Sequence, residues 1–129
     1  MKILRFEDIE AWQAARELVK LVYKAINSDK RFKRDFRLAS QVQDAAVSSM
    51  GNIAEGFSRK SNKEFIQYLY ISKGSAAEVQ SHIYVALDQD YVSKEDFEAI
   101  YRQAEKVSRL DSGFIKYLDS EVRQRKQPK

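Results

Sequence analysis

Cysteine is absent from this chain, and proline and glycine are scarce: its 129 residues include no Cys, one Pro and four Gly. Without thiols the chain can form neither a disulfide nor a thiolate metal site, and it has no cysteine nucleophile. Because glycine and proline mark the many turns of sheet proteins, their scarcity favours long helices. A chain of this length is expected to fold as one domain around one core.

A long apolar run is also missing. No stretch approaches the roughly 20 consecutive apolar residues that cross a bilayer, and Glu7 and Asp8 precede any signal-like apolar segment. We therefore expect a cytoplasmic protein without a membrane partner.

Most of the net positive charge comes from the last ten residues of the sequence. The formal net charge is +4, and within the last ten residues Arg123, Arg125, Lys126 and Lys129 are opposed only by Glu121. Because the rest of the chain is nearly neutral, nucleic-acid binding would depend on local patches and not on bulk charge. We expect a single bundle domain over residues 1–122 and a basic, disordered tail over 123–129.

Apolar residues recur every three or four positions in four stretches, which predicts four amphipathic helices. They cover about 8–27, then from the end of a charged connection at 29–37 to about 59, then about 61–88 and about 93–121. Ser61 or Asn62 can cap the third helix, and Ser93 opens the fourth with a capping-box pattern. Because short links make successive helices antiparallel, the expected fold is all-α, an antiparallel up-down-up-down four-helix bundle.

The first helix has a wide apolar arc. One stripe includes Trp12 and Ile26, and a second stripe one position earlier includes Ala14, Leu18 and Ala25. The combined arc of about 200° exceeds what one bundle core needs. It fits either contact with a second surface, such as another subunit, or a wide buried face inside a compact monomer.

Two residues are unusual for their positions in the predicted helices. Gly51 lies inside the second helix among many small residues, where glycine costs about 1 kcal/mol relative to alanine, so close packing or a bend is expected there. Asp111 falls on the apolar stripe of the fourth helix. It is either a polar residue that sets the register of the core or a sign that the stripe is partly exposed, and we favour partial exposure.

Several segments resemble a known family. They are Asn52-Ile53-Ala54-Glu55-Gly56-Phe57-Ser58-Arg59, Glu64-Phe65, Tyr68-Leu69-Tyr70-Ile71 with Gly74-Ser75 and Glu78, and, near the start, Phe6-Glu7-Asp8-Ile9 with Trp12-Gln13 and Ala15. Together they are similar to the 23S rRNA intervening sequence protein family, also called the S23 ribosomal protein family. The resemblance implies a four-helix bundle that forms a ring-like homopentamer, has no established molecular function and is suspected of RNA association. It also implies kinship with accessory proteins of diversity-generating retroelements.

A polar ridge runs along the second helix opposite its apolar stripe. Ser48, Asn52, Glu55 and Arg59 lie within about 60° of one another on that helix. Glu55 and Arg59 also have the favourable i, i+4 order for a surface ion pair. We favour hydrogen bonding between helices or subunits for this ridge over a ligand site or plain solvated surface.

Basic residues should gather at both ends of the bundle. An up-down topology places the turn after the second helix at the same end as both termini, so we predict a nucleic-acid-binding set of Arg59, Lys60, Lys63, Arg123, Arg125 and Lys126. Ordinary solvated helix ends are the alternative. At the other end the 29–37 connection is basic but offset by aspartates, and its Phe32 and Phe36 fit caps of the core better than a stacking surface for bases.

No catalytic or metal-binding pattern is recognisable. His82 is the only histidine and, with Glu78, offers two ligands where a metal needs more, so a structural role is preferred and neither a metal nor a cofactor is expected. The chain has no phosphate-cradling glycine loop and no serine elbow. We therefore predict a non-enzymatic protein.

Two functional hypotheses remain. The first is a homo-oligomer, expected to be a pentamer, that associates with RNA or another nucleic acid through a basic end repeated around the ring. The alternative is a protein-protein interaction scaffold without nucleic-acid binding.

Overall fold

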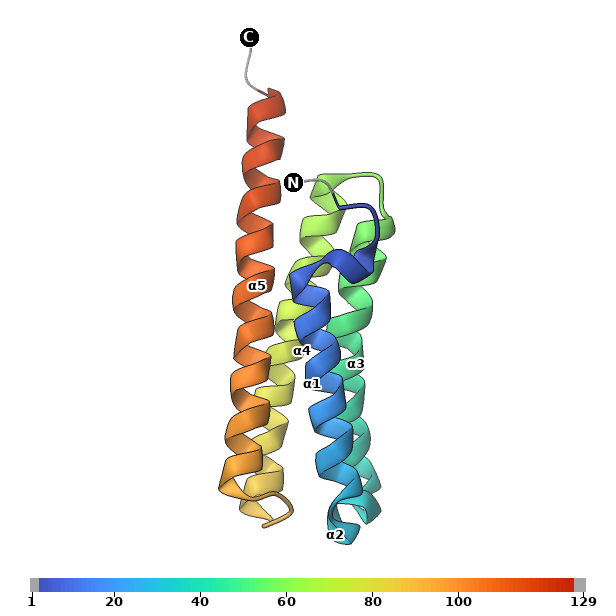
Figure 1. Ribbon diagram of the computed structural model, residues 1–129, viewed down its shortest axis with the longest axis vertical. Coiled ribbons are helices and arrows are strands. Elements are labelled where there is room, and N and C mark those ends of the chain that lie inside the picture. Colours follow the sequence, from blue (N-terminus) through green and yellow to red (C-terminus); the bar gives the residue numbers. More distant parts are fainter. Residues whose placement is uncertain (1–2, 127–129) are drawn as a thin grey trace.

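The computed structural model describes residues 3–126 and contains four long helices that alternate in direction (Figure 1). The elements in chain order are a 3-10 turn η1 (Phe6–Asp8), α1 (Glu10–Asn27), α2 (Lys30–Arg34), α3 (Phe36–Ser58), α4 (Asn62–Asp88) and α5 (Lys94–Lys126). α1 packs on α3 and α5, and α4 packs on the same two helices, so the four surround one core. The predicted all-α bundle is confirmed.

Serine and aspartate side chains begin four of the helices. Asp29 Oδ1 accepts hydrogen bonds from the first backbone N–H groups of α2, and Asp35 caps α3 in the same way. Ser61 Oγ accepts from the Glu64 N–H at 3.3 Å, and Ser93 Oγ accepts from the Asp96 N–H at 3.0 Å. These bonds satisfy donors that have no partner inside a helix, which explains why the helices begin where they do.

The core contains the apolar stripes that the sequence indicated. On α4 all seven positions of the stripe are buried: Phe65, Leu69, Ser72, Ala76, Val79, Ile83 and Ala86. Both stripes of α1 are covered mostly by the chain itself, since Trp12, Leu18 and Ile26 are all buried. The wide arc of α1 is therefore buried mostly within this one chain.

The segment between α1 and α3 differs from the expected connection, because residues 30–34 form the short helix α2. Phe32 is fully buried and stacks on Tyr91, with ring centroids 5.4 Å apart. Phe36 is 76% exposed, so the expectation that it caps the core is wrong. As the first residue of α3 it lies one, three and four turns from Ser40, Val47 and Gly51, all on the outward face of that helix.

The fourth long helix continues further than its apolar pattern indicated. α5 extends to Lys126 and projects past the Ser58–Asn62 turn (Figure 1). Residues 123–126, expected in a disordered tail, are thus helical, while 127–129 lie outside the described part of the chain. No glycine or proline interrupts this stretch, and an ion pair at 3.3 Å joins Asp119 and Arg123 one turn apart.

Close packing of α3 on α4 occurs at Gly56 and not at Gly51. A Cβ atom at Gly56 would lie 2.7 Å from the Phe65 ring and 2.8 Å from Tyr68 Cβ, so only glycine fits there. At Gly51 a Cβ would meet no atom within 4 Å. The predicted close approach at Gly51 is therefore not made by another helix of this chain.

Among the helices of residues 3–126, none combines the length and the apolar character that a membrane span requires.

Candidate nucleic-acid interface

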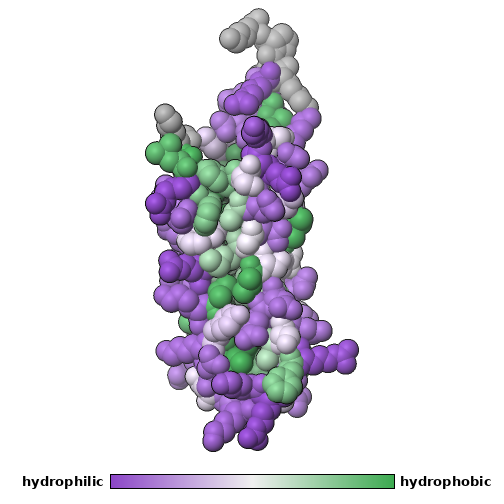
Figure 2. Space-filling model, turned by 90° about the vertical axis from the view of Figure 1, so that its right-hand side faces the viewer, coloured by the Kyte–Doolittle hydropathy of each residue, from purple (hydrophilic) through white to green (hydrophobic). Residues whose placement is uncertain are grey.

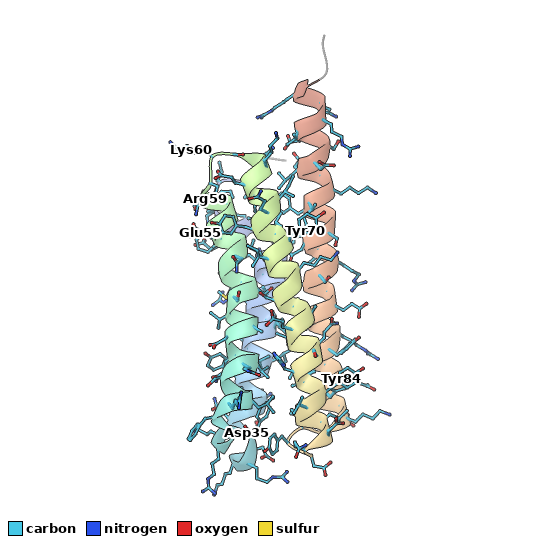
Figure 3. All side chains as sticks on the ribbon, turned by 180° about the vertical axis from the view of Figure 1, so that it is seen from behind. Asp35, Glu55, Arg59, Lys60, Tyr70 and Tyr84 are labelled. Atoms are coloured by element: carbon cyan, nitrogen blue, oxygen red, sulfur yellow. The ribbon has the colours of Figure 1, made fainter. Side chains whose placement is uncertain are left out.

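One end of the bundle, here called the turn end, carries the Ser58–Asn62 turn, the N-terminal segment and the last turns of α5 (Figure 1). Figure 3 shows Arg59 and Lys60 at this turn, with Glu55 one turn below them on α3. Asn62 Nδ2 donates to Glu121 Oε1 at 3.5 Å, which places the start of α4 beside α5. The structure thus brings the predicted basic set to one end of the molecule.

Arg59 is the most constrained member of that set. Its Nε lies 3.8 Å from Glu55 Oε2, and its guanidinium donates a 2.6 Å hydrogen bond to the Tyr68 hydroxyl. The guanidinium carbon also lies 5.1 Å from the centroid of the Tyr68 ring, a cation–π distance. Arg59 therefore links α3 to α4 and is less available to a phosphate than its sequence position suggests.

The other predicted cations differ in how they are engaged. Arg123 is paired with Asp119 at 3.3 Å, but its side chain is 78% exposed, so the pair contributes little and leaves the charge accessible. Lys60, Lys63 and Arg125 are exposed and have no ion-pair partner among residues 3–126. The side chain of Lys126 lies outside the described part of the structure. At least three accessible positive charges therefore lie at this end.

The polar ridge of α3 faces α4. Ser48 Oγ and Ser75 Oγ lie 3.0 Å apart, and Asn52 Nδ2 donates to the Ser48 carbonyl at 2.7 Å and to Ser48 Oγ at 3.0 Å. The upper half of the ridge is the Glu55–Arg59 pair, which reaches Tyr68 of α4. The ridge thus makes hydrogen bonds between helices of one chain, which was one of the roles expected for it.

Asp111 is fully buried, so the expectation of partial exposure is wrong. Its Oδ2 accepts a 2.7 Å hydrogen bond from Ser72 Oγ, and Ser72 Oγ lies 3.0 Å from Ser49 Oγ. Its Oδ1 has no hydrogen-bond partner within the described residues. Burial raises the pKa of the Asp111 carboxyl to about 7, although the Ser72 hydrogen bond and the positive charge of Lys73 lower it.

The three residues form a polar layer that joins α3, α4 and α5 inside the core. The sequence offered a signal for it, because Ser49, Ser72 and Asp111 each occupy a position with apolar neighbours one turn away. A buried polar layer of this kind disfavours sliding of the helices, since any other register would leave the hydroxyls and the carboxyl without partners.

The surface cavities are shallow and of mixed character. A polar pocket of about 330 Å³ between α3 and α4 is lined by Asp44, Ser48, Ser75, Glu78 and His82, among others. An apolar groove of the same volume separates the N-terminal segment from α5. Among residues 3–126 no three His, Asp or Glu side chains are placed to hold a metal ion together.

The family relationship is clear from comparisons with known proteins. A family model described as the 23S rRNA-intervening sequence protein matches residues 7–113. No curated protein is similar enough to this chain to match it. Neither comparison tests the expected kinship with accessory proteins of diversity-generating retroelements, which stays a prediction.

A solved structure shares the fold. It is the crystal structure of a protein with unknown function from the S23 ribosomal protein family of Bacteroides thetaiotaomicron VPI-5482, which is 23% identical to this chain and superposes with a TM-score of 0.69. The match covers 82% of this chain and 94% of that one. Since the family model spans most of the sequence, the chain belongs to the 23S rRNA-intervening sequence protein family.

Proposed function

We propose that this protein is a non-enzymatic bundle that assembles with copies of itself. The observation that carries the proposal is the apolar outward face of α4, on which Tyr70, Ile71, Tyr84 and Val85 are 57%, 50%, 49% and 44% exposed. Figure 3 shows Tyr70 and Tyr84 at two levels of the helix. The solvent face of a monomeric bundle is normally covered with charged residues, and an exposed apolar face indicates contact with a partner. Glu78 is the exposed carboxylate between Ile71 and Val85 on this face.

The middle of this face suits close contact with another helix. Gly74 and Ala77 are exposed between the Tyr70–Ile71 and Tyr84–Val85 pairs, and a Cβ at Gly74 would meet no atom within 4 Å. Glycine in a helix interior costs about 1 kcal/mol, a cost that no packing inside this chain explains. A partner helix can approach closely at Gly74 while the larger side chains pack on either side of it.

A second apolar strip lies on a different side of the bundle. Val47 is 44% exposed on α3, with Met50 and Ala54 half-buried beside it and Val19 and Tyr23 on the adjacent α1. Figure 2, which looks at the side formed by α1 and α3, shows apolar and near-neutral residues running lengthwise between charged flanks. Two different strips on one chain permit head-to-tail assembly, which closes into a ring when the rotation fits. The proposed number of copies is five, as the resemblance implied.

Light scattering after size exclusion tests the proposal. The wild type is expected to elute as an oligomer at micromolar concentration, and the variant Ile71→Lys with Val85→Lys as a folded monomer. The matched control is Ala99→Lys with Ser120→Lys, which places the same charges at exposed positions of α5 and should leave the oligomer intact. A wild-type monomer, or an oligomer that tolerates lysine on α4, contradicts the proposal.

RNA binding at the turn end is the second candidate function. Its support is the three accessible cations Lys60, Lys63 and Arg125, together with a matching family whose description names 23S rRNA. Lys and Arg at helix ends neutralise phosphates, and repetition of the turn end around a ring would multiply a weak contact.

Replacement of the six basic residues of the predicted set by glutamine tests this second function. Bulk RNA at about 50 and 200 mM salt should bind the variant at least tenfold more weakly than the wild type, with a shallower salt dependence. A wild-type oligomer that is indifferent to RNA at both salt concentrations would favour the alternative, a protein-protein interaction scaffold without nucleic-acid binding.

A further inference from the structure

The end of the bundle opposite the turn end carries a compact basic surface around α2. Neither of the functions proposed above involves this surface. We call it the basic corner, and it consists of Lys30, Lys33, Arg34, Phe36 and Arg37. All five side chains are exposed, and Phe36 is 76% exposed. None of the four basic side chains has an ion-pair or hydrogen-bond partner among residues 3–126.

The neighbouring carboxylates form no ion pair with the four cations of the corner. Asp29 and Asp35 accept hydrogen bonds from the first N–H groups of α2 and α3, and Asp35 Oδ2 also accepts from the Tyr91 hydroxyl at 3.0 Å. The Phe32 N–H, foremost, and the Arg31 side chain hold the pKa of Asp29 below its ordinary value. Both aspartates therefore serve as helix caps.

Arg31 separates the corner from the acidic connection between α4 and α5. Its guanidinium donates to the Asp90 carbonyl at 2.6 Å, pairs with Asp29 at 3.3 Å and lies over the Tyr91 ring. At 100° per residue, Lys33 is on the flank of α2 opposite Arg31, and Lys30 and Arg34 lie opposite the buried Phe32. Lys33 thus lies on the side of α2 away from Arg31, and Figure 3 shows the lower end near Asp35 with long side chains extending outward.

An exposed aromatic ring among unpaired cations has a specific chemical meaning. Bases of a single strand stack on aromatic faces, while Lys and Arg beside the ring neutralise the phosphates that link those bases. A membrane surface fits less well, because interfacial helices need a broad apolar face and the apolar residue of α2, Phe32, is buried. A duplex fits less well too, since its bases are already stacked on one another.

We propose that the basic corner binds single-stranded nucleic acid, with a base stacked on Phe36 and three or four phosphates held by Lys30, Lys33, Arg34 and Arg37. The site lies at the opposite end from the predicted turn-end set (Figure 1), so binding at either end can fail without the other.

The test measures binding of fluorescein-labelled 12-nucleotide oligouridylate and oligodeoxythymidylate by anisotropy between about 50 and 200 mM salt. Four neutralised phosphates predict a slope of about −2.8 in log K against log salt, which is an approximately 50-fold loss over that range. The variant Lys30→Gln, Lys33→Gln, Arg34→Gln, Arg37→Gln should lose most of this slope. Phe36→Ala should weaken binding about tenfold at every salt concentration, and Phe36→Tyr should restore it.

A control variant carries the same charge change elsewhere: Arg102→Gln, Arg109→Gln, Lys106→Gln and Lys116→Gln, all exposed on α5. It should bind like the wild type. The proposal is overturned if the wild type does not bind either oligonucleotide at 50 mM salt, or if the control loses as much affinity as the corner variant. It is equally overturned if Phe36→Ala has no effect, or if the protein binds phosphatidylserine vesicles and not the oligonucleotides. Because every altered side chain is exposed, circular dichroism should show that all variants remain folded.

Discussion

The two ends of the bundle carry similar numbers of basic residues but hold them differently. At the turn end the cations come from separate segments, and Arg59 and Arg123 are paired with carboxylates. At the basic corner four cations lie within eight residues and none is paired within the described part of the chain. The comparison shows that the availability of a cation depends on whether a neighbouring carboxylate forms an ion pair with it. Asp29 and Asp35 cap helices and pair with none of the four corner cations, whereas Glu55 and Asp119, each one helical turn away, pair with Arg59 and Arg123.

The largest expected effect distinguishes the buried Phe32 of α2 from the exposed Phe36 of the basic corner. Phe32→Ala removes a fully buried ring that stacks on Tyr91, so the free energy of unfolding should fall by about 3–5 kcal/mol. Phe36→Ala removes an exposed ring and should change it by less than about 0.5 kcal/mol. Urea unfolding of both variants measures the contrast. Equal losses would mean that Phe36 supports the fold and is not a free stacking surface.

The contribution of the buried Asp111 to the free energy of unfolding should depend on pH. Asp111 has a folded pKa of about 7, above its ordinary value of 3.8, so the unfolded chain gives up this proton first as pH rises. Its contribution to stability is therefore fully present below about pH 4, declines up to about pH 7 and is level above that. Within this window the decline approaches about 1.4 kcal/mol per pH unit.

Asp111→Asn tests the origin of this slope, because asparagine has a similar shape and does not titrate. Urea unfolding at pH 4.5, 6 and 8 should show that the variant lacks the decline seen in the wild type. Glutamine variants of the basic corner serve as the control and should keep it. A wild-type stability that does not fall between pH 4.5 and 7 would contradict the assignment.

A smaller effect is expected when the charges of the two ends are compared directly. With the 12-nucleotide oligouridylate, the four-residue corner variant should lose more affinity at 50 mM salt than the turn-end variant Lys60→Gln, Lys63→Gln, Arg125→Gln. The reason is that the corner places four unpaired cations within eight residues, together with the exposed ring of Phe36. Anisotropy titrations of both variants measure the order, and the reverse order would break the comparison.

The smallest effect concerns Arg59. Arg59→Gln removes an exposed ion pair with Glu55 and a hydrogen bond to Tyr68, so the free energy of unfolding should fall by no more than about 1 kcal/mol. Arg59→Lys keeps the charge but loses the planar donor, and it should restore only part of the loss. A loss of several kcal/mol would instead make Arg59 a central structural link between α3 and α4.

The periodicity of the sequence was enough to predict the bundle, because apolar spacing and short links leave few alternatives. It was not enough for residues whose environment depends on several helices at once. Asp111 is buried because Ser72 of α4 supplies a donor, and Phe32 is buried because Tyr91 lies against it. Neither partner is near in sequence, so spacing within one helix could not reveal them.

The candidate site shows the same limit. Sequence position correctly sorted the basic residues between the two ends, since up-down topology follows from helix order alone. It could not show that Asp29 and Asp35 serve as helix caps. The positive charge of the 29–37 segment was therefore interpreted as offset by aspartates. The exposure of Phe36 also depends on the bend at Asp35, where the chain leaves α2 and enters α3.

Photo-crosslinking reports directly which end of the molecule a single strand contacts. A 12-nucleotide RNA that carries 4-thiouridine would be bound to the wild-type protein, irradiated, and the crosslinked peptides identified by mass spectrometry. Binding at the basic corner predicts adducts within residues 30–37, with Phe36 or its immediate neighbours modified. Adducts confined to residues 58–63 and the last turns of α5, or no adducts at all, would contradict it.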